Sequence, residues 1–477
     1  MGGVESAAVE DVADVAIIGN GPSALALAAA LSGLVPEVRS APVGDPEVAE
    51  LARRWAGKTV DEIKLPEDFK PPKRRCLNPM AALIDAFHYP DGDGRGQSLL
   101  RYGQLKPFLR HTVIGSGPTG GSWQSMSPST MTLSPGSWMD LPGHTLTDHL
   151  RSSGLASEEA HDLQHYYGSA EALAAARVPR WLVAEYYSAY AQRLTSTEFL
   201  SGTVQSMEED EDGHWKLQIS MPGEEADHCK TVKAKAVALA TGTADVPRRL
   251  QIPGEDLDFV THRPPIHNQE LLAKIGHLLV VGAGLSAADA ILHALGLSAE
   301  GVNVRVTHVF RGKAADTKIG NMFGQTSLAS MYRDEEWLAK MMQGSVSDPR
   351  YTAKAEAQLQ EILEDGTCII KTNEGQERVE EVSVVALLLG AGPSLHFLPS
   401  SLRKAQRPEP YLPRTRADGQ PSSHPYFLEV IPETLQLADA KTGQVLRQNV
   451  FALGPLRGDN FIRFLTGDAF VVRRQLE

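Results

Sequence analysis

Two short segments have the glycine spacing of a turn that binds the diphosphate of a dinucleotide. The first places Gly19 and Gly21 ahead of the small residue Ala24, and the second places Gly282 and Gly284 ahead of Ser286 and Ala287. The first glycine of such a turn allows a tight bend, the second admits the diphosphate, and the small residue lets helix and strand pack closely. Each segment follows an apolar run and precedes a helical pattern, which favours a dinucleotide site over a purely structural glycine turn.

The charge that follows the second turn indicates which dinucleotide binds there. The apolar run 302–310 is followed by Arg311. A basic residue at this place neutralises the 2′-phosphate of NADPH, whereas an acidic residue would bind the ribose hydroxyls of NADH. We therefore predict NADPH at the second turn, with an ordinary surface arginine as the alternative. Two dinucleotide sites in one chain suit an enzyme that passes a hydride from NADPH to FAD, so we expect FAD at the first turn.

Repeated strand–glycine–helix units predict an α/β fold built on parallel sheets. We expect two dinucleotide-binding, Rossmann-like domains, with the NADPH domain inserted into the FAD domain. The expected bounds are a disordered N-terminus at 1–13, an FAD-binding domain at 14–245 and 390–477, and an NADPH-binding domain at 246–389. Residues 35–110 are polar, rich in proline and poorly periodic, so we expect them to form an insertion with a mobile loop near 91–96.

Composition and charge exclude several classes of protein. The chain has 46 Lys and Arg against 59 Asp and Glu, and its formal net charge of −13 disfavours non-specific nucleic-acid binding. Its three cysteines are far apart and form no Cys-x-x-Cys, which argues against a zinc site and a disulfide reductase, and we expect no metal. No apolar run is long enough to span a membrane and no signal-peptide core is readable, so a cytoplasmic location is expected. The opening residues formally match a myristoylation pattern at Gly2, a kind of match that is usually accidental.

Three segments resemble flavin-containing monooxygenases in their order and spacing. Gly120, Gly121 and Trp123 match the Gly-Gly-x-Trp segment beside the FAD of those enzymes, and Thr241 and Gly242 match their Ala-Thr-Gly linker between domains. Residues 388–390 are similar to their second linker. Segments 120–143 and 321–332 are closest to the oxidative stress-induced growth inhibitor family, a divergent branch of these monooxygenases, and the chain is identified as a member.

This resemblance implies an FAD- and NADPH-dependent monooxygenase. In such enzymes the reduced flavin takes O2 and forms a C4a-hydroperoxide, which oxygenates a small molecule or a protein side chain in a pocket that excludes water. The resemblance also implies a role in restraining growth, in cell death or in cytokinesis, with a possible location at the midbody. The protein partners, the oligomeric state and the substrate stay open.

The same resemblance implies roles for several further residues. It places Trp123 beside the flavin, and it places Gly458 and Asp459 near the ribityl chain and the pyrimidine end of the ring. Asn321 is the candidate polar group near the reacting flavin or nicotinamide. The alternatives are a simple core tryptophan at position 123 and an asparagine that caps a turn at position 321.

The chain departs from the monooxygenase pattern where the ribose of FAD should bind. The acidic residue that usually ends the second strand is missing, and Ile114 and Gly115 occupy its region, which bears on how tightly FAD is held.

Three hypotheses for the function follow. The chain is an active NADPH-dependent monooxygenase; or it is an amine N-hydroxylase of the same fold, if Trp123, Met126 and 139–142 line an amine pocket; or it is a regulatory or interaction protein on this fold with little or no turnover.

Overall fold

The computed structural model describes residues 12–66, 69, 78–92, 96–103, 107–126, 130–152, 158–223, 229–265, 269–299, 304–317, 319, 331–407 and 427–477. The chain divides into two compact units. The first unit combines Met1–Thr243 with Pro393–Glu477, and the second unit is Ala244–Gly392. The second unit is thus a single continuous segment that interrupts the first in the sequence.

The first unit is built on a seven-stranded sheet with strand order β5-β4-β1-β8-β7-β6 and with β19 also paired to β8. Strands β5, β4, β1, β8 and β19 are parallel, while β6, β7 and β8 form an antiparallel meander. The strands of this sheet are β1 (Val12–Ile18), β4 (His111–Gly115), β5 (Glu198–Ser201), β6 (Thr203–Glu209), β7 (Trp215–Ser220), β8 (Cys229–Leu239) and β19 (Val450–Ala452).

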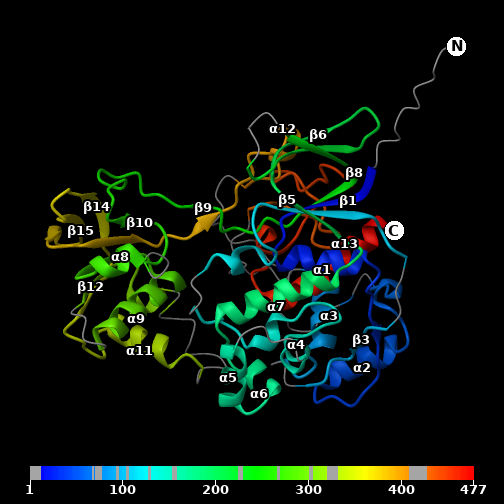
Figure 1. Ribbon diagram of the computed structural model, residues 1–477, viewed down its shortest axis with the longest axis horizontal. Helices are drawn as coiled ribbons and strands as arrows, with labels where there is room; N and C mark the ends of the chain where they lie inside the picture. The colour runs from blue at the N-terminus through cyan, green and yellow to red at the C-terminus, as the bar shows by residue number, and fades with distance from the viewer. Residues whose placement is uncertain are drawn as a thin grey trace. The chain divides into compact units, whose positions relative to one another are not determined.

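Both faces of this sheet are buried, so β1 is apolar on both sides rather than alternating. Val15 and Ile17 pack with helices on one face, and Ala16 and Ile18 pack with residues from the range 395–456 on the other. Figure 1 shows helices of this layer beside the sheet. The helices of this layer are α1 (Pro22–Leu31), α3 (Pro79–His88), α7 (Arg180–Arg193) and α13 (Leu465–Leu476).

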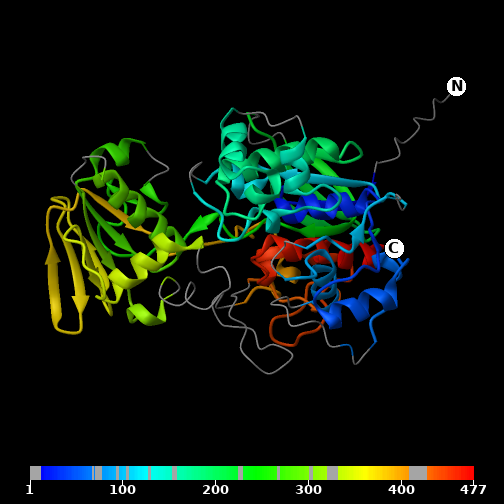
Figure 2. The same cartoon turned by 90° about the horizontal axis from the view of Figure 1, so that it is seen from below.

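The second unit has a fully parallel five-stranded sheet in the order β10-β17-β11-β12-β13. Helices cover one face, and the antiparallel meander β14–β16 covers the other (Figures 1 and 2). Its elements are β9 (Val246–Pro247), β10 (Val260–Thr261), α8 (Gln269–Lys274), β11 (His277–Val281), α9 (Leu285–Ala299), β12 (Arg305–Val309), η5 (Ala314–Asp316), α11 (Arg333–Met342), β13 (Tyr351–Lys354), β14 (Gln358–Ile362), β15 (Cys368–Thr372), β16 (Gly375–Val379), β17 (Val384–Leu387) and β18 (Ala391–Gly392).

The α/β class with two Rossmann-like units is confirmed. Strand β1 begins at Val12, inside the segment 1–13 that was expected to be disordered, because Val12 and Ala13 pair with Lys233 and Ala234 of β8. Residues 35–110, expected as an insertion, contain regular structure. Their described part folds into β2 (Glu37–Val38), α2 (Pro46–Trp55), η1 (Val60–Glu62), α3 and β3 (Leu100–Arg101).

The remaining elements of the first unit connect these layers. Within the described residues, no helix combines the length and the apolar character needed to cross a membrane. The connecting elements are η2 (Gly121–Gln124), η3 (Gly136–Met139), α4 (Leu146–Arg151), α5 (Glu158–Tyr167), α6 (Ala170–Ala174), α12 (Ser400–Arg403), η7 (Gly454–Arg457) and η8 (Ile462–Phe464).

Helix α3 is the part of 35–110 that reaches deepest into the core. It packs against α13, and the contact is so close that a Cβ at Gly467 would overlap Ala81. Asp85 of α3 is 1% exposed and accepts two hydrogen bonds from the guanidinium of Arg463, at 2.5 and 2.8 Å. The same guanidinium stacks on Tyr89 and Trp138 at 4.4 and 4.3 Å. This ion pair fixes residues 35–110 to the C-terminal segment.

We predict that Asp85→Ala destabilises the chain by about 3–5 kcal/mol, because it leaves the buried Arg463 guanidinium without its carboxylate. The free energy of unfolding in urea measures the effect. Glu50→Ala is the matched control, since it removes a carboxylate from the exposed Arg53–Glu50 pair, and it should cost less than about 1 kcal/mol. Equal losses in the two variants would contradict a structural role for the Asp85 pair.

Candidate cofactor-binding sites

The first glycine turn connects β1 to α1 and depends on close backbone packing. Gly19 has φ +111°, and a Cβ at this position would overlap the carbonyl of Ala240. The N–H of Gly19 donates to the carbonyl of Ile114 at 2.7 Å. Gly21 differs from Gly19 because a Cβ there would have its nearest neighbour, the Cα of Gly121, at 3.9 Å. The space above Gly21 is therefore open, as a diphosphate requires.

The second turn, between β11 and α9, repeats this geometry. Gly282 has φ +125°, and a Cβ there would overlap the carbonyl of Leu388. Its N–H donates to the carbonyl of Val309 at 3.0 Å, as Gly19 donates to Ile114. A Cβ at Gly284 would have nothing within 4 Å. Both turns thus have a first glycine fixed by backbone contact and a second glycine that faces open space.

The helices that begin at these turns can supply free N–H groups to phosphate. Gly21 is the N-cap of α1, no side chain caps the helix, and Pro22 follows. Ala24 and Ala287 are fully buried, which is consistent with close packing of helix on strand, and Ser286 is exposed. Uncapped N–H groups and the helix dipole together favour an anion at a helix N-terminus.

The Gly-Gly-x-Trp segment lies directly against the first turn. Gly120 and Gly121 have φ +111° and +61°, and a Cβ on Gly121 would lie 2.9 Å from the Cα of Gly21. The Gly120 N–H donates to the carbonyl of Asn20 at 2.9 Å. Trp123 is half-buried, and its ring meets Tyr187 edge-on with the centroids 6.2 Å apart. This contact shows that Trp123 packs on α7; its position beside a flavin stays a prediction.

Thr241 and Gly242 follow β8, next to the carbonyl that contacts Gly19. The hydroxyl of Thr241 is buried, and no residue in the described part of the chain forms a hydrogen bond with it. A buried hydroxyl without a partner is costly to the protein, so a ligand that supplies one would be favoured here. Gly242 has φ +71° and open space around its Cα. The residues around the first turn therefore fit a dinucleotide.

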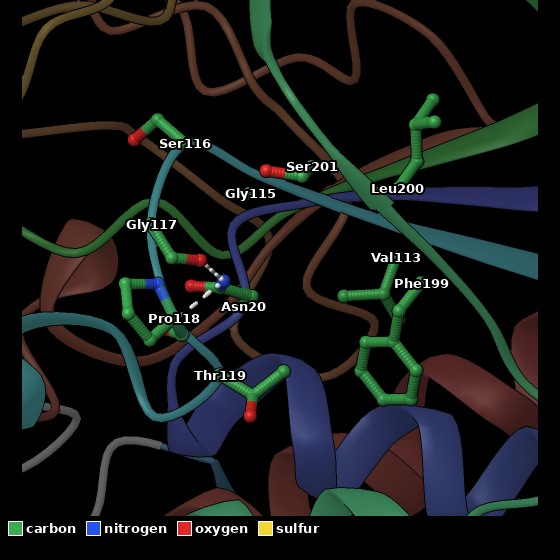
Figure 3. A pocket seen from close by; sticks show the side chains of 10 residues that line it. All are labelled: Asn20, Val113, Gly115, Ser116, Gly117, Pro118, Thr119, Phe199, Leu200 and Ser201. Carbon is green, nitrogen blue, oxygen red and sulfur yellow. Dashed lines mark hydrogen bonds between the residues drawn. The ribbon is translucent and has the colours of Figure 1, made fainter. Parts of the chain in front are cut away.

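A cavity of about 490 Å³ opens beside the first turn, between the segment after β4 and the end of β5. Figure 3 shows its lining. Asn20 lies between the two walls and donates from Nδ2 to the carbonyls of Gly117 and Pro118, at 2.6 and 3.2 Å. The lining is uncharged throughout, and it consists of Asn20, Val113, Gly115, Ser116, Gly117, Pro118, Thr119, Phe199, Leu200 and Ser201. Its size suits the adenosine half of a dinucleotide.

The C-terminal segment reaches the same turn from another direction. A Cβ on Gly454 would overlap the hydroxyl of Ser23 in the first turn of α1. Gly458 then ends η7 with φ +99°. Asp459 is buried and forms an ion pair with the fully buried Arg457, which also lies 3.3 Å from the carboxylate of Asp468. Asp459 is thus part of a buried charge cluster rather than a free carboxylate facing a ligand.

Arg311 stands two residues after β12, at the end of the strand beside the second turn. It is exposed and forms no ion pair with any described residue, so its guanidinium is available to a phosphate. Asn321, the candidate near the reacting ring, lies outside the described residues. The structure therefore gives a position for Arg311 and none for Asn321.

The segment 139–142, proposed as the wall of an amine pocket, is buried under α7. Tyr187 donates to the carbonyl of Met139 at 3.2 Å and Tyr190 to that of Pro142 at 2.6 Å. The carboxylate of Asp140 accepts the N–H of Leu146 at 2.8 Å and is 7% exposed. These contacts use the segment's polar groups inside the protein, so the geometry does not favour an amine site here.

Sequence reasoning missed three groups of residues near these sites. Asn20 was passed over as the variable position of its turn. Arg457 and Asp468 were not connected to Asp459, because a buried ion pair has no local sequence signal. Asp85 lay in the range interpreted as an insertion, although the apolar run around it was a usable signal for a buried helix.

The fold and the paired turns define a two-domain oxidoreductase of the dinucleotide-binding class. The sequence model of the pyridine nucleotide-disulphide oxidoreductase family matches residues 151–416. The chain is 30% identical to the human protein named oxidative stress-induced growth inhibitor 2, over 97% of this chain and 92% of that protein. It therefore belongs to the oxidative stress-induced growth inhibitor family, as the sequence predicted.

Solved structures with the same fold include both reductases and monooxygenases. The bacillithiol disulfide reductase of Bacillus cereus is 15% identical, with a TM-score of 0.54 over 98% of this chain and 99% of its own. The FAD-bound cadaverine monooxygenase of Erwinia amylovora is 12% identical, with a TM-score of 0.55 over 98% of this chain and 95% of its own. The family match and this shared fold support FAD and NADPH as the cofactors.

The family model that matches this chain is named for disulphide oxidoreductases, so the described cysteines are relevant to whether the chain could reduce a disulfide. Cys229 in β8 and Cys368 in β15 are both free, and they belong to different units. Burial raises the pKa of the Cys368 thiol to about 12, so it stays protonated and is a poor nucleophile. The two described cysteines therefore offer no redox pair, in agreement with their spacing in the sequence.

We predict that Asp468 makes the stability of the chain depend on pH. Burial is the main cause that raises its pKa from 3.8 to about 7; the charge of Arg457 opposes this rise and that of Asp459 adds to it. The folded chain thus holds a proton that the unfolded chain releases, so the free energy of unfolding should fall as pH rises from about 4 to 7. Asp468→Asn removes this titration, and between pH 5 and 8 it should gain at least about 1 kcal/mol relative to wild type in urea unfolding. Parallel pH profiles for the two proteins would contradict this assignment.

Proposed function

We propose that the chain is an FAD- and NADPH-dependent monooxygenase. The observation that carries the proposal is the repeated turn geometry, because Gly21 and Gly284 both face open space at the start of a helix. FAD is assigned to the first unit and NADPH to the second, so the FAD-binding domain is 14–245 with 390–477 and the NADPH-binding domain is 246–389. Paired nucleotide sites suit an enzyme in which NADPH reduces a flavin.

In this proposal each group of residues has a defined task. Gly19, Gly21 and Ala24 with Thr241 and Gly242 bind FAD at the first turn. Gly120 and Gly121 lie beside the FAD, and Trp123 packs beside the flavin. Gly458 and Asp459 lie near the ribityl chain and the pyrimidine end of the flavin. Gly282, Gly284, Ser286 and Ala287 hold the diphosphate of NADPH, and Arg311 neutralises its 2′-phosphate. Asn321 is the candidate polar group near the reacting ring.

Bound FAD would take a hydride from NADPH and activate O2, so that one oxygen atom passes to a substrate and the other leaves as water. The protein binds and orients the two nucleotides and keeps water from the flavin. The substrate is a small molecule or a protein side chain. Monooxygenase chemistry is favoured over disulfide reduction because the described cysteines form no redox pair.

The biological setting is proposed from the family. A human member is named oxidative stress-induced growth inhibitor 2, and we propose that this chain likewise restrains growth in response to redox conditions. Cell death and cytokinesis are the processes in which such restraint would act, and the cytoplasm is the expected location. A regulatory protein without turnover is the competing outcome of the experiment below.

Two matched glycine variants test the paired sites. Gly21→Val should fold, since a Cβ there meets no atom closer than 3.9 Å, but its side chain would occupy the space of the diphosphate and abolish FAD retention. Gly284→Val should fold and retain FAD but lose NADPH. The purified proteins are compared for flavin absorbance, NADPH affinity and NADPH-driven consumption of O2. If the wild-type chain folds but does not bind FAD, the proposal of an enzyme is refuted, and the hypothesis of a regulatory protein without turnover remains.

Arg311→Ala tests the choice of nicotinamide. We expect NADPH affinity to fall at least about tenfold while NADH affinity stays unchanged, because only NADPH carries a 2′-phosphate. Arg263→Ala is a control, since it removes an arginine of the same unit that lies outside the proposed site. Equal losses for NADPH and NADH would remove Arg311 from the 2′-phosphate site.

A further inference from the structure

The ribose-binding carboxylate that the sequence lacks has no room in this structure. In dinucleotide-binding units the acidic residue ends the second strand, which in the first unit is β4 with Gly115 as its last residue. A Cβ on Gly115 would overlap Cγ of Asn20. The side chain of Asn20 therefore occupies the volume into which an acidic side chain at Gly115 would project.

The second unit shows the reverse arrangement. The first glycine of each turn donates its N–H to the neighbouring strand, at Ile114 in the first unit and at Val309 in the second. These two residues are therefore equivalent. It follows that Gly115 corresponds to Phe310 and that Asn20 corresponds to Ala283. The second unit thus has a minimal side chain in the turn and a large one at the strand end. The first unit has an amide in the turn and no side chain at the strand end. In the first unit the two positions share one space, which the side chain of Asn20 fills.

The two ends of the Asn20 amide have different surroundings. Its Nδ2 is bonded to the carbonyls of Gly117 and Pro118, which fixes both the amide and the loop after β4 (Figure 3). In the described part of the chain no donor is bonded to Oδ1, and Asn20 lines the cavity beside the turn. An acceptor at the cavity wall, held in place by the loop, is what a ribose hydroxyl needs.

We propose that Asn20 replaces the missing carboxylate and that its Oδ1 accepts a hydrogen bond from a ribose hydroxyl of the adenosine half of FAD. This inference rests on the proposed assignment of FAD to the first unit. A neutral amide makes a weaker hydrogen bond to a hydroxyl than a carboxylate does, because charge-assisted bonds are roughly twice as strong. FAD is therefore held here by an uncharged contact, in a cavity whose whole lining is uncharged.

The experiment pairs a protein variant with a change in the ligand. Affinities of wild type and Asn20→Ala are measured by flavin fluorescence for FAD and for an FAD analogue whose adenosine carries a 2′,3′-dideoxyribose. Wild type should bind the analogue about tenfold more weakly than FAD, which is the usual worth of one hydrogen bond. Asn20→Ala should bind both ligands equally, because the hydroxyl has lost its partner.

This cycle separates a ribose contact from a merely structural role. If Asn20 only orders the loop, the variant loses affinity for both ligands and keeps the tenfold ratio, and that result would overturn the inference. Gln205→Ala, at an exposed position of β6 outside the cavity lining, is the control that should keep the ratio. Wild type that fails to bind FAD at all would refute the proposed function, and the inference would fall with it.

A second variant keeps the test valid if Asn20→Ala does not fold. Gly115→Ala leaves the amide in the sequence but pushes it away with a methyl group, and it should also lose the preference for FAD over the dideoxy analogue. Asn20→Ala with Gly115→Glu should restore a preference of at least tenfold, because the vacated space admits a carboxylate at the strand end. If Gly115→Ala still binds FAD about tenfold more tightly than the dideoxy analogue, the inference is wrong.

Discussion

The structure depends on a backbone contact that leaves no room for a side chain. Gly19 lies against the carbonyl of Ala240, and Gly282 lies in the same way against the carbonyl of Leu388. This contact brings the start of each helix over the carboxyl edge of its sheet, so that the second glycine of the turn faces open space. The Gly-Gly-x-Trp segment and Thr241 are arranged around the first of these turns, and the cavity beside it is shaped by Asn20.

Buried charges hold the distant parts of the first unit around that turn. Asp85 and Arg463 are far apart in the sequence, yet each is the main partner of the other. Arg457, Asp459 and Asp468 form a second buried charge cluster within the C-terminal segment, which also contacts the first turn of α1 through Gly454 and Ser23. Buried ion pairs of this kind are costly to break and tolerate little change of geometry. The range 35–110 is therefore part of the core that supports the first turn.

The chemistry cannot be inferred from the fold, because the same fold is found in a disulfide reductase and in an amine monooxygenase. The described residues of this chain bear on both possibilities. The described cysteines form no pair, and Cys368 is buried as a neutral thiol. The polar groups of 139–142 are bonded within the protein. These features are consistent with a nucleotide-dependent oxidoreductase and do not favour an amine pocket at 139–142.

The sequence by itself determined what is local. Both turns were recognised, together with the apolar run that precedes each, because glycine spacing and apolar runs act over a few residues; the second run is strand β11. The depth at which α3 is buried was decided only by the tertiary structure, since Arg463 lies 378 residues from Asp85. That the side chain of Asn20 fills the space beside Gly115 could also not be predicted from the sequence. Two side chains compete for one space only when the strands bring them together, and no local pattern records that competition.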